Sequence, residues 1–264
     1  MNGSANLNVM QKAARKAGRS LVKDFREVES LQASVRGAEE FVRKADAASE
    51  KILREELRAA RGTYGWLTKG ATTEEGEDPT RRWIVDPLDG STNFQHGLAH
   101  WGISIALEHK GQIVAGVVYD AAKDEMFFAE KGAGAWMNDT RLRVSGRARM
   151  IESMFATGIP YAGRADLPMV LQDIARLAPT CAGIRRFGCA ALDLAYVAAG
   201  RYEGFWERRL NAWDMAAGMI LVREAGGFVE PIKTDGNILE DGEILACNEA
   251  ISRSFAKAVR GKSA

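Results

Sequence analysis

The sequence predicts a layered α/β fold, and three patterns support that prediction. Helical periodicity opens the chain, strand-like segments with short turns fill residues 101–138, and helices alternate with strands from residue 166 onward. A length of 264 residues with 46% hydrophobic residues suits one large domain. We expect a single domain over residues 1–264, built from two closely packed halves at roughly 1–150 and 151–264.

Two helices are expected near the N-terminus. The first has apolar or small residues every three or four positions: Leu7, Met10, Ala14, Ala17 and Leu21. The second is predicted over residues 47–61, where Gly62 follows as a C-cap. Residues 63–82 are rich in Thr, Gly and Glu and are predicted to form a loop, which leads into a strand at 83–85.

The remaining elements follow from turn signals and periodicity. Residues 101–138 contain short apolar runs joined by Lys-Gly and charged turns, which predicts an antiparallel meander. Beyond the meander we expect a C-terminal helix preceded by helices over 166–177, 190–199 and 213–225 and strands over 184–187, 204–206 and 243–247.

Composition excludes several classes of function. With 36 basic and 35 acidic residues the net charge is +1, so neither general nucleic-acid binding nor a membrane surface is expected. No apolar run approaches the ~20 residues that span a bilayer. The N-terminal residues lack the apolar core of a signal peptide. The three cysteines lack CxxC spacing, so we expect no zinc site or disulfide framework and a reducing, cytoplasmic compartment.

Two fragments carry the chemistry. In residues 83–94, WIVDPLDGSTNF, an apolar run ends at Asp86 and Asp89, and a Gly-Ser-Thr segment begins what is expected to be a helix. Hard divalent cations bind such oxygen groups, and phosphate binds free N–H groups at a helix start. Asp-Pro and Asp-Gly also form ordinary turns. The second fragment, Trp213-Asp214 with Gly226-Gly227 after an eleven-residue interval, makes the turn interpretation the weaker one.

Together, these fragments resemble the signature of the inositol monophosphatase family, within the superfamily of Mg-dependent, lithium-sensitive phosphatases. The resemblance extends from the N-terminal helix almost to the end of the chain and is strongest to the bacterial branch. It implies the αβαβα five-layer sandwich of sugar-phosphate phosphatases, a homodimer, and two or three Mg²⁺ ions per site. Inhibition by Li⁺ is expected if the enzyme is active.

The resemblance also implies roles for individual residues. Asp86 would bridge two Mg²⁺ ions, Leu88 would offer its backbone carbonyl, and Asp89 and Asp214 would complete the second metal position. Asp46 matches an aspartate beside the third metal, which is the role we favour, and it could at the same time be a helix N-cap.

Other positions match the substrate side of the family site. Gly90 and Ser91 would supply N–H groups to phosphate, and the Ser91 hydroxyl, which replaces the usual threonine, would help to orient the attacking water. The segment Gly188-Cys189-Ala190 resembles a Gly-Ser/Thr-Ala segment whose backbone touches substrate hydroxyls. Glu207 matches a glutamate that accepts inositol hydroxyls, although a solvated ion pair is the simpler interpretation of Glu207 alone.

One carboxylate position departs from the family pattern. The family has a Glu-Glu pair whose first member binds metal and holds the attacking water. Counting without a gap from residues 64–67, YGWL, puts Lys69-Gly70 at these positions, and we favour this alignment. We then expect Lys69 to turn to solvent and one metal to be bound poorly, because an ammonium repels Mg²⁺. Alternatively the loop folds back and delivers Glu74 from the pair Glu74-Glu75.

The sequence therefore predicts a Mg²⁺-dependent phosphomonoesterase that hydrolyses inositol 1-phosphate or a related sugar or cyclitol phosphate with a metal-activated water. Fructose 1,6-bisphosphate, a nucleotide phosphate and histidinol phosphate remain possible substrates, because related pockets differ mainly in their loops. The alternative is a weakly active or inactive paralog that works through protein or RNA contacts, and Lys69-Gly70 is the feature that favours it.

Overall fold

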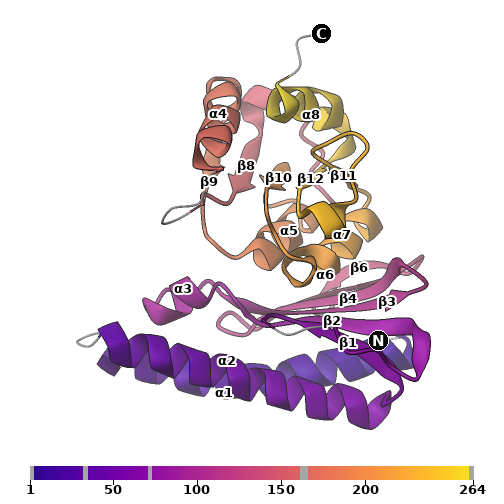
Figure 1. Cartoon of the computed structure of the whole chain (residues 1–264). Coiled ribbons are helices and arrows are strands. Elements are labelled where there is room, and N and C mark those ends of the chain that lie inside the picture. The colour runs from indigo at the N-terminus through magenta and orange to yellow at the C-terminus, as the bar shows by residue number, and fades with distance from the viewer. Residues whose placement is uncertain (1–2, 32–34, 71–72, 161–165, 262–264) are drawn as a thin grey trace.

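A computed structural model describes residues 3–31, 35–70, 73–160 and 166–261. Figure 1 shows five layers: a helix pair, a seven-stranded sheet, a second helix pair, a five-stranded sheet and an outer helix pair. The αβαβα sandwich implied by the resemblance is thereby confirmed. Within these ranges no helix has both the length and the apolar composition that spanning a bilayer requires.

The first layer consists of α1 (Ala5–Leu31) and α2 (Val35–Ala60), which lie along one face of the first sheet (Figure 1). The apolar face predicted for the first helix is buried. The predicted start of the second helix at residue 47 is wrong, because buried Val42 and Ala45 continue its apolar face toward the N-terminus. Asp46 therefore lies inside α2, and its interpretation as an N-cap is also wrong.

The first sheet has the order β1-β2-β3-β4-β5-β6-β7. Its strands are β1 (Tyr64–Thr68), β2 (Asp78–Asp89), β3 (Gly102–His109), β4 (Gln112–Asp120), β5 (Glu125–Glu130), β6 (Gly134–Met137) and β7 (Thr140–Arg141). Strands β3 to β6 form the antiparallel meander predicted for residues 101–138. The loop predicted over 63–82 is wrong in part, because it contains β1 and the start of β2; its residues 71–72 lie outside the described residues.

Helices α5 (Ala190–Ala198) and α6 (Ala212–Glu224) form the layer between the two sheets. Both are buried over most of their length, because their apolar residues belong to one core cluster that includes side chains from both sheets. Gly218 permits the close approach of the two helices, since a Cβ there would lie 2.4 Å from the Cβ of Leu194. The middle layer is thus packed on both sides.

The second sheet has the order β11-β12-β10-β8-β9 and is covered on its outer face by α4 (Leu167–Leu177) and α8 (Ser252–Arg260). Its strands are β8 (Met154–Thr157), β9 (Gly183–Arg185), β10 (Gly204–Glu207), β11 (Phe228–Pro231) and β12 (Ile244–Cys247). The helices and strands predicted beyond residue 166 are confirmed within about two residues. The sequence analysis missed β8, β11 and the short helix α7 (Ile238–Asp241).

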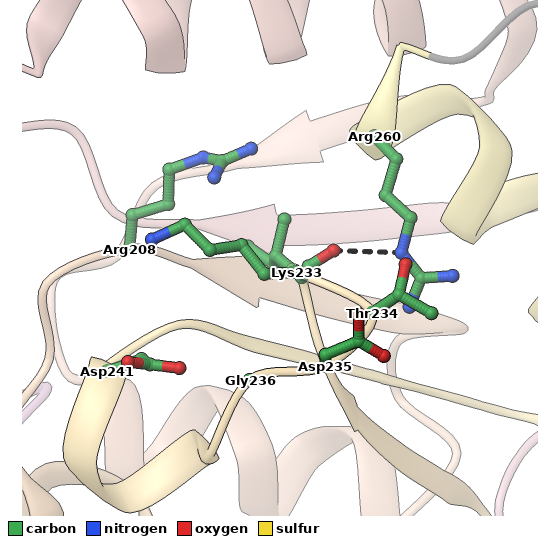
Figure 2. A pocket seen from close by; sticks show the side chains of 8 residues that line it. Arg208, Lys233, Thr234, Asp235, Gly236, Asp241 and Arg260 are labelled. Carbon is green, nitrogen blue, oxygen red and sulfur yellow. Dashed lines mark hydrogen bonds between the residues drawn. The ribbon is translucent and has the colours of Figure 1, made fainter.

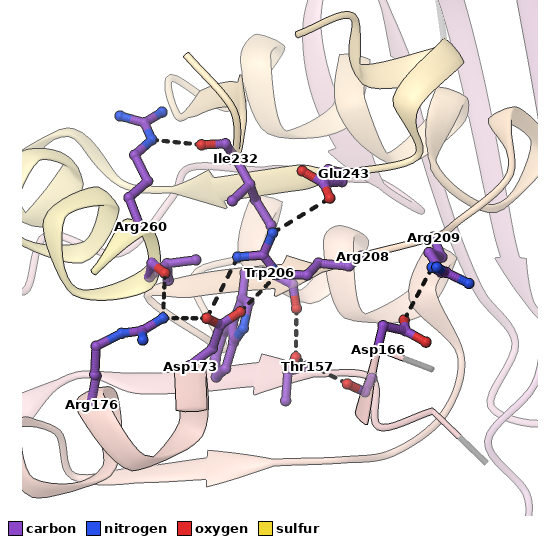
Figure 3. Close-up of polar contacts among 12 residues, drawn as sticks. Thr157, Asp166, Asp173, Arg176, Trp206, Arg208, Arg209, Ile232, Glu243 and Arg260 are labelled. Carbon is purple, nitrogen blue, oxygen red and sulfur yellow. Dashed lines mark hydrogen bonds and ion pairs between the residues drawn. The ribbon is translucent and has the colours of Figure 1, made fainter. Parts of the chain in front are cut away.

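Buried ion pairs connect the end of β10 to the outer helix α4. Arg208 follows β10 directly, and its Nε donates to Oδ2 of the fully buried Asp173 at 2.9 Å. The Nη1 of Arg208 lies 3.4 Å from Oε1 of Glu243, and Arg176 also donates to Asp173 (Figure 3). This cluster fixes the strand end that carries Glu207.

Candidate active site

The end of β2 forms an irregular turn. Its pairing with β3 shifts register between Asp86 and Asp89. Asp86 is buried, and its Oδ1 accepts a hydrogen bond from the Leu88 amide at 3.0 Å. The Ser49 hydroxyl of α2 donates to the Pro87 carbonyl at 2.8 Å. The first helix layer thus holds the turn in place.

Asp89 connects this turn to the middle helix layer. Its Oδ2 accepts hydrogen bonds from the Ala191 amide at 2.8 Å and from the Cys189 thiol at 3.1 Å. Burial, together with the nearby charge of Asp214, raises the pKa of Asp89 to about 6. The two motifs DPLDGS and Gly188-Cys189-Ala190, about a hundred residues apart in the chain, therefore meet at Asp89.

Gly90 has the left-handed conformation that the next turn requires. Its φ is 78°, and a Cβ would lie 2.9 Å from the His100 carbonyl oxygen. Ser91 then begins the short helix α3 (Ser91–Gln95), as the sequence predicted. The Asn93 side chain donates to the carbonyls of His100 and Phe187 at 2.8 and 2.7 Å. The phosphate-binding candidates Gly90 and Ser91 are thus held between two other segments.

Asp214 reaches the same region from the start of α6. Its Oδ2 accepts from the amide of Asn211 at 2.7 Å and from the side-chain nitrogen of Asn211 at 3.1 Å, in a capping box. Burial raises the pKa of Asp214, whereas its hydrogen bonds with Asn211 and the charge of Lys69 act in the opposite direction. The charges of Asp89 and Asp214 both raise the pKa of the buried Asp86, so the three carboxyls form one acidic group.

Lys69 points into this group, which corrects the expectation that it turns to solvent. Its Nζ donates to the Leu88 carbonyl at 3.3 Å and lies 3.5 Å from Oδ2 of Asp46. Burial by itself lowers the pKa of Lys69, but Asp86, Asp46, Asp89 and Asp214 together raise it above its ordinary value. The ammonium is therefore the positive centre of the acidic site.

Glu74, the alternative source of the missing carboxylate, is bound elsewhere. Its carboxylate accepts hydrogen bonds from Arg54 and Arg58, and the hydrogen bond from Arg54 is the main reason that its pKa is lowered. Its backbone pairs with Trp66, three residues before Lys69 on β1. At ~3.3 Å per strand residue, this places Glu74 about 10 Å from the level of Lys69. The structure thus opposes the return of Glu74 to the aspartates.

The candidate substrate residues lie at the middle layer and the second sheet. Gly188 and Cys189 precede α5, and Ala190 is its first residue. Glu207 ends β10, and its carboxylate lies against Gly158, where a Cβ would be 1.8 Å from Oε1. The structure brings the segment 188–190 to the aspartates through the Cys189–Asp89 contact, whereas Glu207 acts on Asp193 of the same helix.

Asp193 was missed by the sequence analysis. It lies in the first turn of α5, is 1% exposed, and its Oδ1 has no hydrogen-bond partner among the described residues. Its pKa is raised by burial and then by the charges of Glu207 and Asp89. An aspartate inside the otherwise apolar helix AALDLAYVA was the available signal, because an acidic residue is seldom buried without a partner.

The acidic group suits Mg²⁺ by its chemistry. Four carboxyl groups, those of Asp46, Asp86, Asp89 and Asp214, act on a single ammonium, so their ionised forms leave an excess of negative charge. Carboxylate and carbonyl oxygens are the ligands that Mg²⁺ prefers. Among the described residues, no three His, Cys, Asp or Glu side chains converge closely enough to form a metal site without rearrangement. The oxygen groups present are therefore of the kind that binds Mg²⁺, but in this structure they are arranged around the ammonium of Lys69.

A separate cavity of about 530 Å³ lies beside the end of β11 (Figure 2). Its basic residues are Arg208, Lys233 and Arg260. Each of them is within 4 Å of a carboxylate, Glu243 for the first two and Glu230 for Arg260. Because these cations are already paired, the cavity is a weaker phosphate site than the turn at Gly90.

Comparison with known proteins gives a consistent result. The family model described as "Inositol monophosphatase family" matches residues 4–263. The chain is 51% identical over 260 residues to an inositol-1-monophosphatase of Mesorhizobium japonicum, which covers 98% of both chains. It is also 39% identical over 254 residues to the Nus factor SuhB of Escherichia coli, with 96% of this chain and 95% of that protein covered.

Solved structures agree with the fold. The extragenic suppressor protein suhB of Bartonella henselae superposes with a TM-score of 0.89 at 48% identity, covering 98% of this chain and 100% of that chain. An inositol monophosphatase from Anabaena superposes with a TM-score of 0.82 at 32% identity, with 97% and 96% covered.

Proposed function

Because this chain belongs to the inositol monophosphatase family, we propose that it is a Mg²⁺-dependent phosphatase that hydrolyses inositol 1-phosphate or a related sugar or cyclitol phosphate. The observation that supports this most strongly is the meeting of Asp86, Asp89 and Asp214, of which Asp86 is buried and the other two are partly exposed. They come from the end of β2 and the start of α6, which are far apart in the sequence. A purely structural role would not explain why two further carboxyls lie beside the buried Asp86, because their charges add to the cost of burying it.

The proposed metal ligands are Asp86, the Leu88 carbonyl, Asp89 and Asp214. When bound there, Mg²⁺ would stabilise charge on the phosphoryl oxygens and lower the pKa of a bound water. Asp89 keeps its orientation through the Ala191 amide, and Asp214 through Asn211, so both carboxylates are positioned before any ligand arrives.

The remaining candidates would position the substrate. Gly90 and Ser91 would present backbone N–H groups, and the Ser91 hydroxyl would orient water. Gly188, Cys189 and Ala190 would contact sugar hydroxyls through their backbone. Glu207, with the newly found Asp193 beside it, would accept hydrogen bonds from those hydroxyls. Carboxylate and backbone groups of this kind can hydrogen-bond several hydroxyls of a polyhydroxylated leaving group.

Phosphate release from inositol 1-phosphate across a Mg²⁺ titration tests this proposal. We expect Mg²⁺-dependent release by the native chain and a loss of about 10²-fold in Asp214→Asn. Asp235→Asn, a change at an exposed aspartate near the separate cavity, is the matched control and should stay within twofold of the native rate. Absence of Mg²⁺-dependent release from the folded native chain would overturn the proposal.

A second candidate function is partner binding with weak or absent catalysis. It is favoured by Lys69 in place of a family glutamate and by the similarity to the Nus factor SuhB. Lys69→Glu separates the two candidate functions. If the native chain has little phosphatase activity, the substitution should raise the rate of phosphate release; if the native chain is already active, the substitution should change that rate little. A simultaneous Gly70→Glu change is less informative, since Gly70 has a φ of 73° that a side chain would strain.

The homodimer, the cytoplasmic location and the division into two halves stay predictions. Sedimentation equilibrium of the native chain tests the first of them, and a mass near 28.8 kDa would refute it.

A further inference from the structure

We propose that the ammonium of Lys69 is a built-in cation of the acidic site, which takes the place of one metal ion of the set implied by the family. The native chain then binds fewer divalent ions than a chain with glutamate at this position. This inference rests on the proposed function for the identity of the ion, because Mg²⁺ enters only through that proposal.

The sheet itself determines where Lys69 lies. Strands β1 and β2 pair in parallel, with Thr68 opposite Val85 at the end of the register. Lys69 directly follows the end of β1 and Asp86 directly follows Val85 on β2, so the two positions are neighbours. A chance side-chain rotation would therefore not account for the proximity of Lys69 to this acidic group.

The contacts of Lys69 are those expected of a bound cation. Its Nζ is 3.3 Å from the Leu88 carbonyl oxygen, which is the backbone atom assigned to a metal by the resemblance. It is also 3.5 Å from Oδ2 of Asp46, which the resemblance puts beside a metal. The side chain is 38% exposed while Asp86 is 1% exposed, so Lys69 reaches a buried acidic group from the protein surface.

Glu74 does not supply the missing carboxylate at this position, because Arg54 and Arg58 engage it. An ammonium and a dication compete for the same oxygens, since like charges repel and each needs those oxygens as its partners. Buried carboxylates nevertheless need compensation when no metal is bound, and Lys69 provides part of it.

Manganese binding tests the proposal directly, with Mn²⁺ as the probe and electron paramagnetic resonance as the readout. We expect Lys69→Met to lower the Mn²⁺ Kd about tenfold and Lys69→Glu to bind one more Mn²⁺ per chain than the native protein. Lys51→Met removes one charge from an exposed lysine of α2 and should leave both the Kd and the stoichiometry within twofold. Equal Kd and stoichiometry in the native chain, Lys69→Met and Lys69→Glu would overturn the proposal.

Thermal unfolding in chelator gives a second, independent readout. Lys69→Met should unfold at a lower temperature than the native chain in chelator and recover when Mg²⁺ is added, whereas Lys51→Met should behave like the native chain. Folding of Lys69→Met only in the presence of metal would support the proposal, and equal melting temperatures in chelator would contradict it. Neither readout uses phosphate release. A chain that shows the expected Mn²⁺ binding and melting behaviour but no phosphatase activity would therefore refute the proposed function and leave this inference standing.

Discussion

Removal of Arg208 should destabilise the second sheet more than any change in a surface ion pair. The Arg208 side chain is 9% exposed and serves two carboxylates, of which Asp173 is fully buried and Glu243 is 11% exposed (Figure 3). Among the residues that the structure describes, Arg208→Met leaves Asp173 with Arg176 alone and Glu243 with the exposed Lys233 at 3.6 Å. The substitution therefore leaves buried negative charge with poor compensation.

The size of the effect follows from this burial. Breaking a buried ion pair by removing one partner costs about 3–5 kcal/mol. An unfolding entropy of about 2.1 cal/mol/K per residue gives roughly 0.55 kcal/mol/K for this chain. The expected fall in melting temperature is therefore about 5–9 °C.

Differential scanning calorimetry of the native chain and Arg208→Met measures this difference. The control is Arg149→Met, because Arg149 is 72% exposed and its partner Glu152 is 49% exposed. Such a surface pair contributes less than about 1 kcal/mol, so the control should melt within about 2 °C of the native chain. A shift for Arg208→Met no larger than that of the control would refute the reasoning.

Three further predictions use the same calorimetric assay. Gly90→Ala should lower the melting temperature more than Gly132→Ala. Both glycines have positive φ, which costs a side chain about 1–3 kcal/mol of strain, but of the two only a Cβ at Gly90 would meet a backbone oxygen, at 2.9 Å. Equal shifts would contradict this prediction. Phe255 is fully buried between Phe155 and Trp206, so Phe255→Ala should lower the free energy of unfolding by about 3–5 kcal/mol. Phe228 is 46% exposed, so Phe228→Ala should lower it far less, and similar losses would contradict this prediction. Burial lowers the pKa of His100 from 6.5 to about 4, so between these pH values the unfolded chain binds more protons than the folded chain. The native chain should therefore lose stability relative to His100→Phe as the pH falls from 6.5 to about 4. A stability difference that does not depend on pH would contradict this prediction.

The sequence predicted those elements whose signals are local. The face of α1 and the apolar runs of β3 to β6 repeat at short intervals, and each was found. Strand β1 was missed because it has only five residues, one of them glycine, and its parallel partner β2 begins ten residues after its end. Parallel pairing of this kind depends on distant contacts that leave no periodic pattern in the chain.

The residues of the acidic site also differ in whether local sequence patterns could predict their positions. Asp86, Leu88 and Asp89 stand within one motif, so their proximity follows from a single turn. Counting without a gap identified Lys69, but its direction depends on the register of β1 against β2 and on Asp46 from α2. Asp193 can be recognised as a buried, candidate functional residue only once α5 is known to lie between the two sheets, and its neighbours in the sequence do not indicate that position.

The two-sided burial of α5 and α6 affects how the chain emerges from the ribosome. The first sheet is complete at β7, about 80 residues before α6 ends, and its inner face stays uncovered until these two helices have been made. At about 5–20 residues per second, synthesis of that interval takes about 4–16 s. Throughout this time the nascent chain presents an apolar sheet face, which is a natural target for a chaperone.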